Sequence, residues 1–169
     1  MTTTMTQTNT DGDELARCDR RSDHGPFDII GDVHGSTGEL ESLLARLGYD
    51  VRWTGSPQAA QVTVTPPKGR RAVFVGDLVD RGPRAPDALR IVMSMVESGT
   101  AYAVPGNHDV KFQRWLDGKD VKPSHGLDRT IAQLKTEPKA FRTTVRQFIK
   151  RLPIYLWLDG GNLAVAHAG

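Results

Sequence analysis

Cysteine is nearly absent from this chain of 169 residues, in which Cys18 is the only one. A single thiol cannot form an intrachain disulfide, and it cannot build a zinc site of several cysteines. The composition therefore fits a reducing compartment, and we expect the protein to be cytoplasmic.

Long hydrophobic runs are absent as well. No window approaches the roughly 18 consecutive apolar residues that a membrane-spanning helix needs, and the N-terminus lacks the apolar central segment of a secretory signal peptide. A phosphate-binding loop of the GxxxxGK[ST] type is also missing. We therefore expect no membrane partner and no kinase module within these residues.

An excess of one charge is lacking too, because 22 Lys and Arg residues against 20 Asp and Glu residues give a formal charge of +2. Composition alone neither demands nor excludes a nucleic-acid partner. The length and the 38% of hydrophobic residues suffice for one domain with a core. We predict this domain over residues 27 to 169, after a flexible leader of residues 1 to 26 that shows no apolar period.

Short apolar runs alternate with helical patterns along the predicted domain. FDIIGD from Phe27, AVFVGD from Ala72 and AYAVPGN from Ala101 each predict a strand, followed by a loop and a helix. Ser36 and Glu39 have the spacing of a capping box before the first helix, and VTVT indicates a possible edge strand. The final YLWLDGGNLAVAHAG predicts two strands joined by a Gly-Gly turn. This alternation predicts an α/β sandwich whose strand ends carry the functional residues.

Four motifs with possible metal ligands follow these strands. They are GDVHG (31 to 35), GDLVDRG (76 to 82), GNHD (106 to 109) and AHAG (166 to 169). Any one of them alone is an ordinary turn or polar pair, whereas four in one chain, each after an apolar strand, indicate a shared site. The side chains that could converge are Asp32, His34, Asp77, Asn107, His108 and His167.

A metal site explains why acids end buried strands, since an unpaired buried carboxylate is costly. Asp77 is the natural bridge between two cations about 3.5 to 4 Å apart. Mixed carboxylate, amide and imidazole ligands favour Mn²⁺, Fe²⁺ or Zn²⁺ over Mg²⁺.

The four motifs resemble the signature of the calcineurin-like binuclear metallophosphoesterases, especially the branch shared by serine/threonine protein phosphatases and dinucleoside tetraphosphate hydrolases. The segment GNHDVKFQRWLDGKDVKPSHGLDRTIAQL is similar to the phosphatase module of bacterial polynucleotide kinase-phosphatases, which repair RNA ends. The resemblance covers residues 27 to 169. It implies a metallophosphoesterase-type β-sandwich flanked by helices.

The resemblance also implies a cofactor of two divalent metal ions, with Mn²⁺ as the first choice and Fe, Zn or Ni as the others. At matching positions, Asp32, His34 and Asp77 would hold the first metal, and Asp77, Asn107 and His167 the second. His108 would protonate the leaving group, Asp80 would orient His108, and Arg81 would clamp the phosphate. Arg81, Asn107 and His125 would contact the substrate.

The activity so implied is hydrolysis of phosphomonoesters at RNA 2′ or 3′ ends, by attack of metal-activated water on phosphorus. A serine/threonine protein phosphatase and a dinucleoside tetraphosphate hydrolase are alternatives. A metal-binding, catalytically weak module for RNA binding or assembly is an alternative of another class. The expected partner is a phosphorylated RNA end or another phosphoester.

The family pattern supplies one further histidine for the second metal downstream of AHAG, but no histidine follows His167. We therefore expect either a fragment that lacks the C-terminal side of the family domain or a short form with an incomplete second site. Kinase and nucleotidyltransferase modules, which accompany the phosphatase in RNA repair proteins, would lie elsewhere in a longer gene product.

Overall fold

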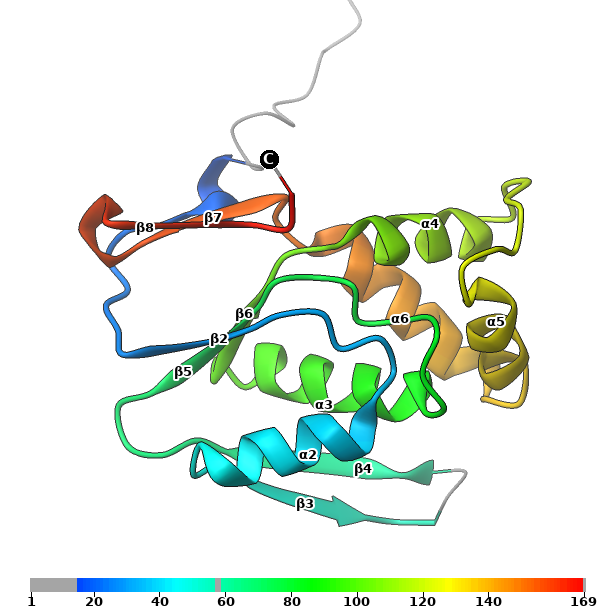
Figure 1. Cartoon of the computed structure of the whole chain (residues 1–169), viewed down its shortest axis with the longest axis horizontal. Helices are drawn as coiled ribbons and strands as arrows, with labels where there is room; N and C mark the ends of the chain where they lie inside the picture. Colours follow the sequence, from blue (N-terminus) through cyan, green and yellow to red (C-terminus); the bar gives the residue numbers. More distant parts are fainter. Residues whose placement is uncertain (1–14, 57–58, 169) are drawn as a thin grey trace, which may run out of the picture.

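Three parallel strands form the sheet that carries the first three motifs. They are β2 (Phe27–Ile30), β5 (Arg71–Phe74) and β6 (Ala101–Ala103), in the order β2-β5-β6. The computed structural model, which describes residues 15 to 56 and 59 to 168, places β5 in the middle (Figure 1). Ala72, Val73 and Phe74 are fully buried, as expected for a parallel strand covered on both faces.

A second sheet lies above the first. The strands β7 (Tyr155–Leu158) and β8 (Leu163–Ala166) are antiparallel, and the short 3₁₀ turn η2 (Asp159–Gly161) connects them. Gly160 and Gly161 have φ values of 65° and 95°, a left-handed backbone that glycine adopts at little cost. The predicted pair of strands with a Gly-Gly turn is therefore confirmed.

The two sheets share a compact apolar core. Val73 of β5 and Val104, which directly follows β6, pack with Leu156, Leu158 and Val165 of the second sheet, and all five are buried. Helices cover the other face of the parallel sheet, so the predicted α/β sandwich flanked by helices is confirmed (Figure 1).

The expectation of a flexible leader is wrong for residues 15 to 26. Strand β1 (Asp19–Arg20) pairs in parallel with β7, and Cys18 is only 1% exposed. Asp23 accepts a hydrogen bond of 2.5 Å from the Tyr102 hydroxyl and pairs with Arg71. Backbone pairing and ion pairs, which leave no apolar period in the sequence, stabilise this segment. Residues 1 to 14 of the expected leader lie outside the described residues.

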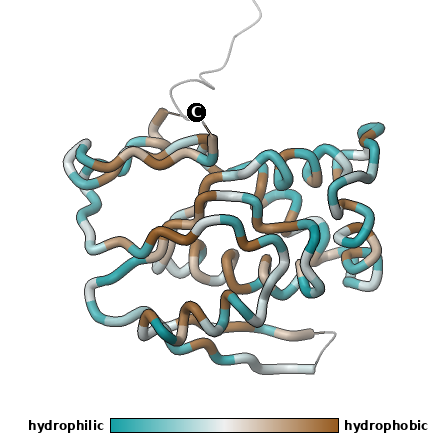
Figure 2. Tube along the Cα trace, in the orientation of Figure 1, coloured by the Kyte–Doolittle hydropathy of each residue, from teal (hydrophilic) through white to brown (hydrophobic). Residues whose placement is uncertain are grey.

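The domain is completed by the helices α2 (Thr37–Arg46), α3 (Ala85–Glu97), α4 (Asn107–Leu116), α5 (Leu127–Lys135) and α6 (Lys139–Arg151). Their buried faces form the larger core with the parallel sheet, including Leu44, Leu89, Phe112 and Leu134. Figure 2 shows hydrophobic residues along the strands and on α3. Within the described ranges, no helix is long and apolar enough to span a bilayer.

Two local predictions have different outcomes. The VTVT segment is part of strand β4 (Gln61–Thr65), which pairs with β3 (Asp50–Thr54) in a separate hairpin. The capping box is wrong, because the Ser36 side chain makes no capping hydrogen bond. Thr37 instead donates to the Arg84 carbonyl at 2.7 Å, which ties the start of α2 to a neighbouring loop.

Candidate metal centre

The topology brings the predicted ligands to one edge of the molecule. Asp32 follows β2, Asp77 follows β5 and Asn107 follows β6, so all three lie at carboxyl ends of parallel strands. His167 follows β8 and reaches the same place from the second sheet. Because β5 is the central strand, Asp77 lies between the others.

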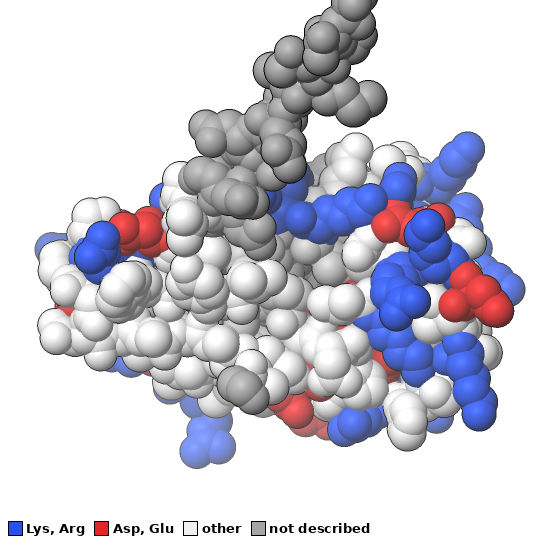
Figure 3. All heavy atoms as spheres, turned by 90° about the horizontal axis from the view of Figure 1, so that it is seen from above, with Lys and Arg blue, Asp and Glu red and all other residues white. Residues whose placement is uncertain are grey.

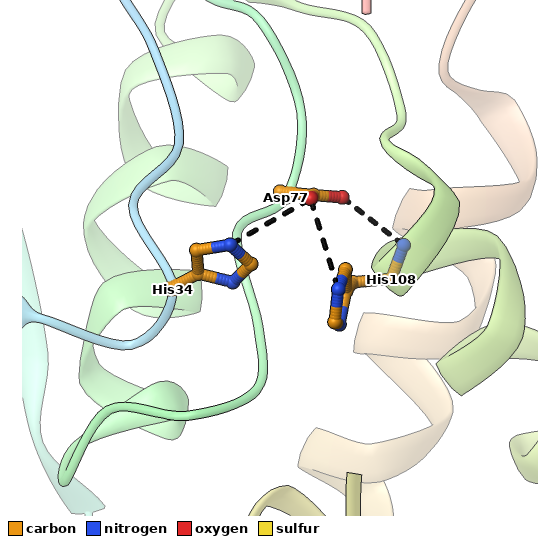
Figure 4. Close-up of side chains that lie close together, drawn as sticks. All are labelled: His34, Asp77 and His108. Carbon is orange, nitrogen blue, oxygen red and sulfur yellow. Dashed lines mark hydrogen bonds and ion pairs between the residues drawn. The ribbon is translucent and has the colours of Figure 1, made fainter. Parts of the chain in front are cut away.

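Asp77 is the centre of this group of side chains (Figure 4). Its Oδ2 lies 3.7 Å from His34 Nε2 and 4.0 Å from His108 Nε2, while its Oδ1 lies 3.5 Å from His167 Nε2. Asp32 Oδ2 lies 3.6 Å from His34 Nε2. The carboxylate of Asp77 thus faces imidazole nitrogens with both oxygens, although the side chain is only 6% exposed.

His34 has the protonation pattern of a metal ligand. Its Nδ1 lies 2.9 Å from the Val79 carbonyl oxygen, which can only accept, so Nδ1 carries the proton and donates. The buried Nε2 has no hydrogen-bond partner among the described residues and faces the carboxylates of Asp32 and Asp77 at 3.6 and 3.7 Å. In the neutral ring this nitrogen carries the lone pair, so one imidazole and two carboxylates form a donor set that fits a divalent metal ion.

His167 repeats this pattern on the other side of Asp77. Its Nδ1 donates to the Val75 carbonyl at 2.7 Å, which leaves the Nε2 lone pair facing Asp77 Oδ1. Asn107 Oδ1 lies 3.2 Å from the same Nε2. In metal sites, a backbone carbonyl typically accepts a hydrogen bond from the ring nitrogen of histidine that does not bind the metal.

Two groups of ligand atoms, each within 4.8 Å of one another, result from this arrangement. One contains His34, Asp77 and His108, and the other contains Asp32, Asp77 and His167. Asp77 belongs to both, in keeping with the expected bridge. The grouping differs from the expected sets, since it places Asp32 with His167 and brings His108 beside His34; the assignment of each ligand to a metal therefore stays a prediction.

The backbone around Asp77 is fixed by close approaches. Val33 and His34 both donate their N–H to the Asp77 carbonyl, at 3.1 and 2.8 Å, and this joins the loops that follow β2 and β5. His108 N–H donates to Asp77 Oδ1 at 3.0 Å. A Cβ atom at Gly106 would overlap the Asp77 carboxylate, so only glycine fits there.

His108 and Asp80 form a buried pair beside the candidate metal ligands. The His108 Nδ1 lies 2.6 Å from Asp80 Oδ2, and both side chains are at most 8% exposed. Arg81 is exposed, and its Nη2 lies 3.3 Å from His108 Nε2. His108 Nε2 therefore has a partner within the protein, whereas His34 Nε2 has none. The expected roles of His34 as a metal ligand and of His108 as a proton-transferring group stay predictions.

Asp109, to which the sequence analysis gave no role, joins two of the motif loops. Its carboxylate is fully buried and accepts N–H groups from Leu78 and Gly106, each at 2.9 Å. Burial raises the pKa of Asp109 to about 7, although these backbone donors act in the opposite direction. The only signal in the sequence is its place as the fourth residue of GNHD.

His125, the other predicted substrate contact, is exposed in the loop before α5 with a φ of 62°. Among the described residues its side chain has no hydrogen bond to the metal centre. The adjacent Gly126 lies directly against the Arg81 backbone. A substrate contact by His125 stays a prediction.

Comparisons with known proteins agree with this geometry. A sequence model of the calcineurin-like phosphoesterase family matches residues 25–169. A bis(5′-nucleosyl)-tetraphosphatase PrpE [asymmetrical] from Bacillus velezensis is 44% identical over 147 residues, which are 85% of this chain and 56% of that protein. The protein of the same name from Bacillus subtilis is 40% identical, over 85% of this chain and 57% of its own length. The chain thus spans little more than half the length of these curated relatives.

Solved structures show the same fold. The crystal structure of a candidate diadenosine tetraphosphatase has a TM-score of 0.58 and 25% identity, and covers 89% of this chain and 53% of its own. A serine/threonine phosphatase from Saccharomyces cerevisiae has a TM-score of 0.56 at 16% identity, over 88% of this chain and 42% of its own. The narrower similarity to the RNA-repair module is not supported, because the curated relatives above are tetraphosphatases. The chain belongs to the calcineurin-like phosphoesterase family.

Proposed function

We propose that this protein is a metal-dependent hydrolase that cleaves dinucleoside polyphosphates. The observation that carries the proposal is the buried Asp77 carboxylate, which faces the lone pairs of His34 and His167 without any Lys or Arg partner among the described residues. The names of the curated relatives support the choice of substrate. They favour the tetraphosphatase alternative over the RNA-end reading.

In this proposal, five side chains would hold two divalent metal ions: Asp32, His34, Asp77, Asn107 and His167. When bound, such ions lower the pKa of water and offset the negative charge of a phosphoryl group. The identity of the metal is left open by the donor set, which suits Mn²⁺, Fe²⁺, Zn²⁺ and Ni²⁺.

Arg81 and His108 would act on the substrate itself. The planar guanidinium of Arg81 is exposed beside His108 and can donate to two phosphate oxygens at once. Asp80 holds the His108 Nδ1–H, so the ring presents Nε2 to the site, where it can hand a proton to the leaving oxygen. The Asp80 carboxylate also stabilises the imidazolium form that this transfer requires.

The surface near these residues suits a polyanion. Figure 3, seen from above, shows Lys and Arg side chains gathered over the side of the molecule that carries α4 and α5. Such a field attracts a chain of phosphates as well as an RNA backbone, so charge alone does not separate the two substrates. Lys111 of α4 is already engaged, because its Nζ donates to the carbonyl and the hydroxyl of Ser124.

The test compares kcat/KM for diadenosine tetraphosphate, a 3′-phosphorylated oligoribonucleotide and a phosphopeptide, with Mn²⁺ added. We expect the tetraphosphate to be the best substrate. Preference for the RNA or the peptide would reject the proposed substrate class while leaving the family intact. Turnover of p-nitrophenyl phosphate in the wild type but not in Asp77→Ala would show that the activity belongs to this site. Absence of all turnover in the metal-loaded wild type would support the catalytically weak module instead.

A further inference from the structure

Helix α5, which carries none of the four motifs, binds the backbone of the loop that contains Asp80 and Arg81. Both residues have left-handed backbones, with φ values of 74° and 63°. This region is unfavourable for residues with a side chain, so it persists only where neighbouring groups fix it. The loop after β2 supplies some of these contacts, such as the bond from Gly82 N–H to the His34 carbonyl, and α5 supplies others.

Three side chains on α5 bind consecutive parts of this loop. Thr130 Oγ1 accepts the Asp80 N–H at 2.9 Å, Arg129 Nη1 donates to the Arg81 carbonyl at 2.6 Å, and Gln133 Nε2 donates to the Gly82 carbonyl at 3.1 Å. Gln133 Oε1 also accepts the Ala85 N–H at 2.7 Å.

Gly126, just before α5, completes the contact. A Cβ atom there would overlap the Arg81 backbone nitrogen, so the helix can approach the loop this closely only with glycine at that position. The helix start and the loop are therefore packed backbone to backbone.

The bond from Thr130 bears directly on the chemistry, because it holds the Asp80 N–H from a different element, whereas the Asp80 carbonyl accepts the Gly82 N–H at 2.7 Å from within the loop. The Asp80 side chain is fully buried, its Oδ2 binds His108 Nδ1, and its Oδ1 has no hydrogen-bond partner among the described residues. The position of the carboxylate therefore depends on the position of the Asp80 backbone. Thr130, which is 1% exposed, binds the N–H of that backbone.

We infer that Thr130 is a positioning residue, which sets His108 for proton transfer through Asp80 and thereby makes α5 part of the catalytic apparatus. The inference rests on the proposed function insofar as His108 is the proton donor. Its predicted signature is specific: a loss that grows with the basicity of the leaving group, since only a poor leaving group needs the proton.

The first experiment compares p-nitrophenyl phosphate with phenyl phosphate, whose leaving group is more basic. We expect Thr130→Val, which keeps the shape but removes the acceptor, to slow phenyl phosphate about tenfold more than p-nitrophenyl phosphate, since small misplacements of catalytic groups cost up to about 10²-fold. Thr130→Ser should restore the wild-type ratio. In a His108→Ala background, Thr130→Val should leave the ratio unchanged, because residues that act as one unit are not additive.

Thr37→Val is the matched control, because Thr37 is equally buried and donates to the carbonyl of Arg84 farther along the same loop. It should lose stability without changing the substrate ratio. If Thr130→Val does not fold, Gln133→Met tests the same loop from a half-buried position and should shift the ratio in the same direction. Equal slowing of both substrates, or an equal shift in the His108→Ala background, would overturn the inference.

The second experiment does not depend on turnover. Proton NMR of the Zn²⁺-treated protein should show the hydrogen-bonded Nδ1–H of His108, identified by its loss in His108→Ala. This resonance should move or broaden in Thr130→Val and return in Thr130→Ser; an unchanged resonance would refute the positioning role. A wild type that hydrolyses aryl phosphates but not diadenosine tetraphosphate would reject the proposed substrate class and leave both tests valid.

Discussion

Replacing Asp77 by asparagine keeps the shape of the side chain and removes the charge that faces the three histidines. Without metal, the variant should be at least as stable as the wild type. The wild-type carboxylate is buried without a Lys or Arg partner among the described residues, which is costly. The asparagine oxygen can still accept the His108 N–H.

With metal, the order should reverse. A ligand that binds only the folded state, present at a hundred times its Kd, stabilises that state by about 2.7 kcal/mol. For a chain of this size this corresponds to a rise in Tm of about 5 to 10 °C. If loss of the shared carboxylate weakens binding a hundredfold, the remaining gain is about 0.4 kcal/mol, or roughly 1 °C.

The assay is thermal unfolding with and without Mn²⁺ or Zn²⁺, combined with elemental analysis of the purified protein. Asp159→Asn is a suitable control, since this exposed aspartate pairs with His24 at the turn between β7 and β8. A variant at Asp77 that keeps the wild-type metal content and the full rise in Tm would refute the placement of the metal centre.

Three further predictions concern single side chains. Asn107→Ala should lose less bound metal than Asp77→Ala, since Asn107 would serve one ion only; equal losses by elemental analysis would contradict the bridge. His108→Ala should slow phenyl phosphate about 10² to 10⁴-fold but p-nitrophenyl phosphate much less, and equal effects would exclude a general acid. Arg70 donates to Asp28 and lowers the pKa of that carboxyl group. The ionised carboxylate therefore stabilises the fold at pH values above the pKa of Asp28 in the unfolded chain, which is about 4. This stabilisation is lost as the pH falls through the lower pKa of Asp28 in the folded protein. In urea unfolding, Asp28→Asn should thus be less stable than the wild type at pH 7, and the difference should shrink as the pH falls below about 4.

The strands and the candidate metal ligands could be predicted because their signals are local. Each ligand follows an apolar run in the sequence, and parallel strands bring their carboxyl ends together without further information. The central position of β5 was not visible in the sequence, yet it explains why Asp77, rather than Asp32, faces both groups of donors.

Other features depend on contacts between distant segments and could not be predicted. Strand β1 forms because β7 offers an open edge, not because Asp19 and Arg20 favour a strand. Asp109 and Thr130 act through backbone N–H groups more than 30 residues away in sequence, at Leu78 and Asp80. Their residue types carry no such information. The four motifs could not separate the RNA-end reading from its alternatives, because calcineurin-like enzymes named for different substrates share this fold.

The position of His167 has a consequence for how the domain is held together. Among the described residues, a small cluster of five buried and four partly buried apolar side chains joins the two sheets. His167 extends from the second sheet to the carboxylate at the end of the first. Ions bound between these residues would act as a cross-link that ties the last described strand to the middle of the chain. Removal of the ions by a chelator should then destabilise the two sheets to different degrees. The amide hydrogens of β7 and β8 would exchange first, while those of the parallel sheet β2-β5-β6 stay protected.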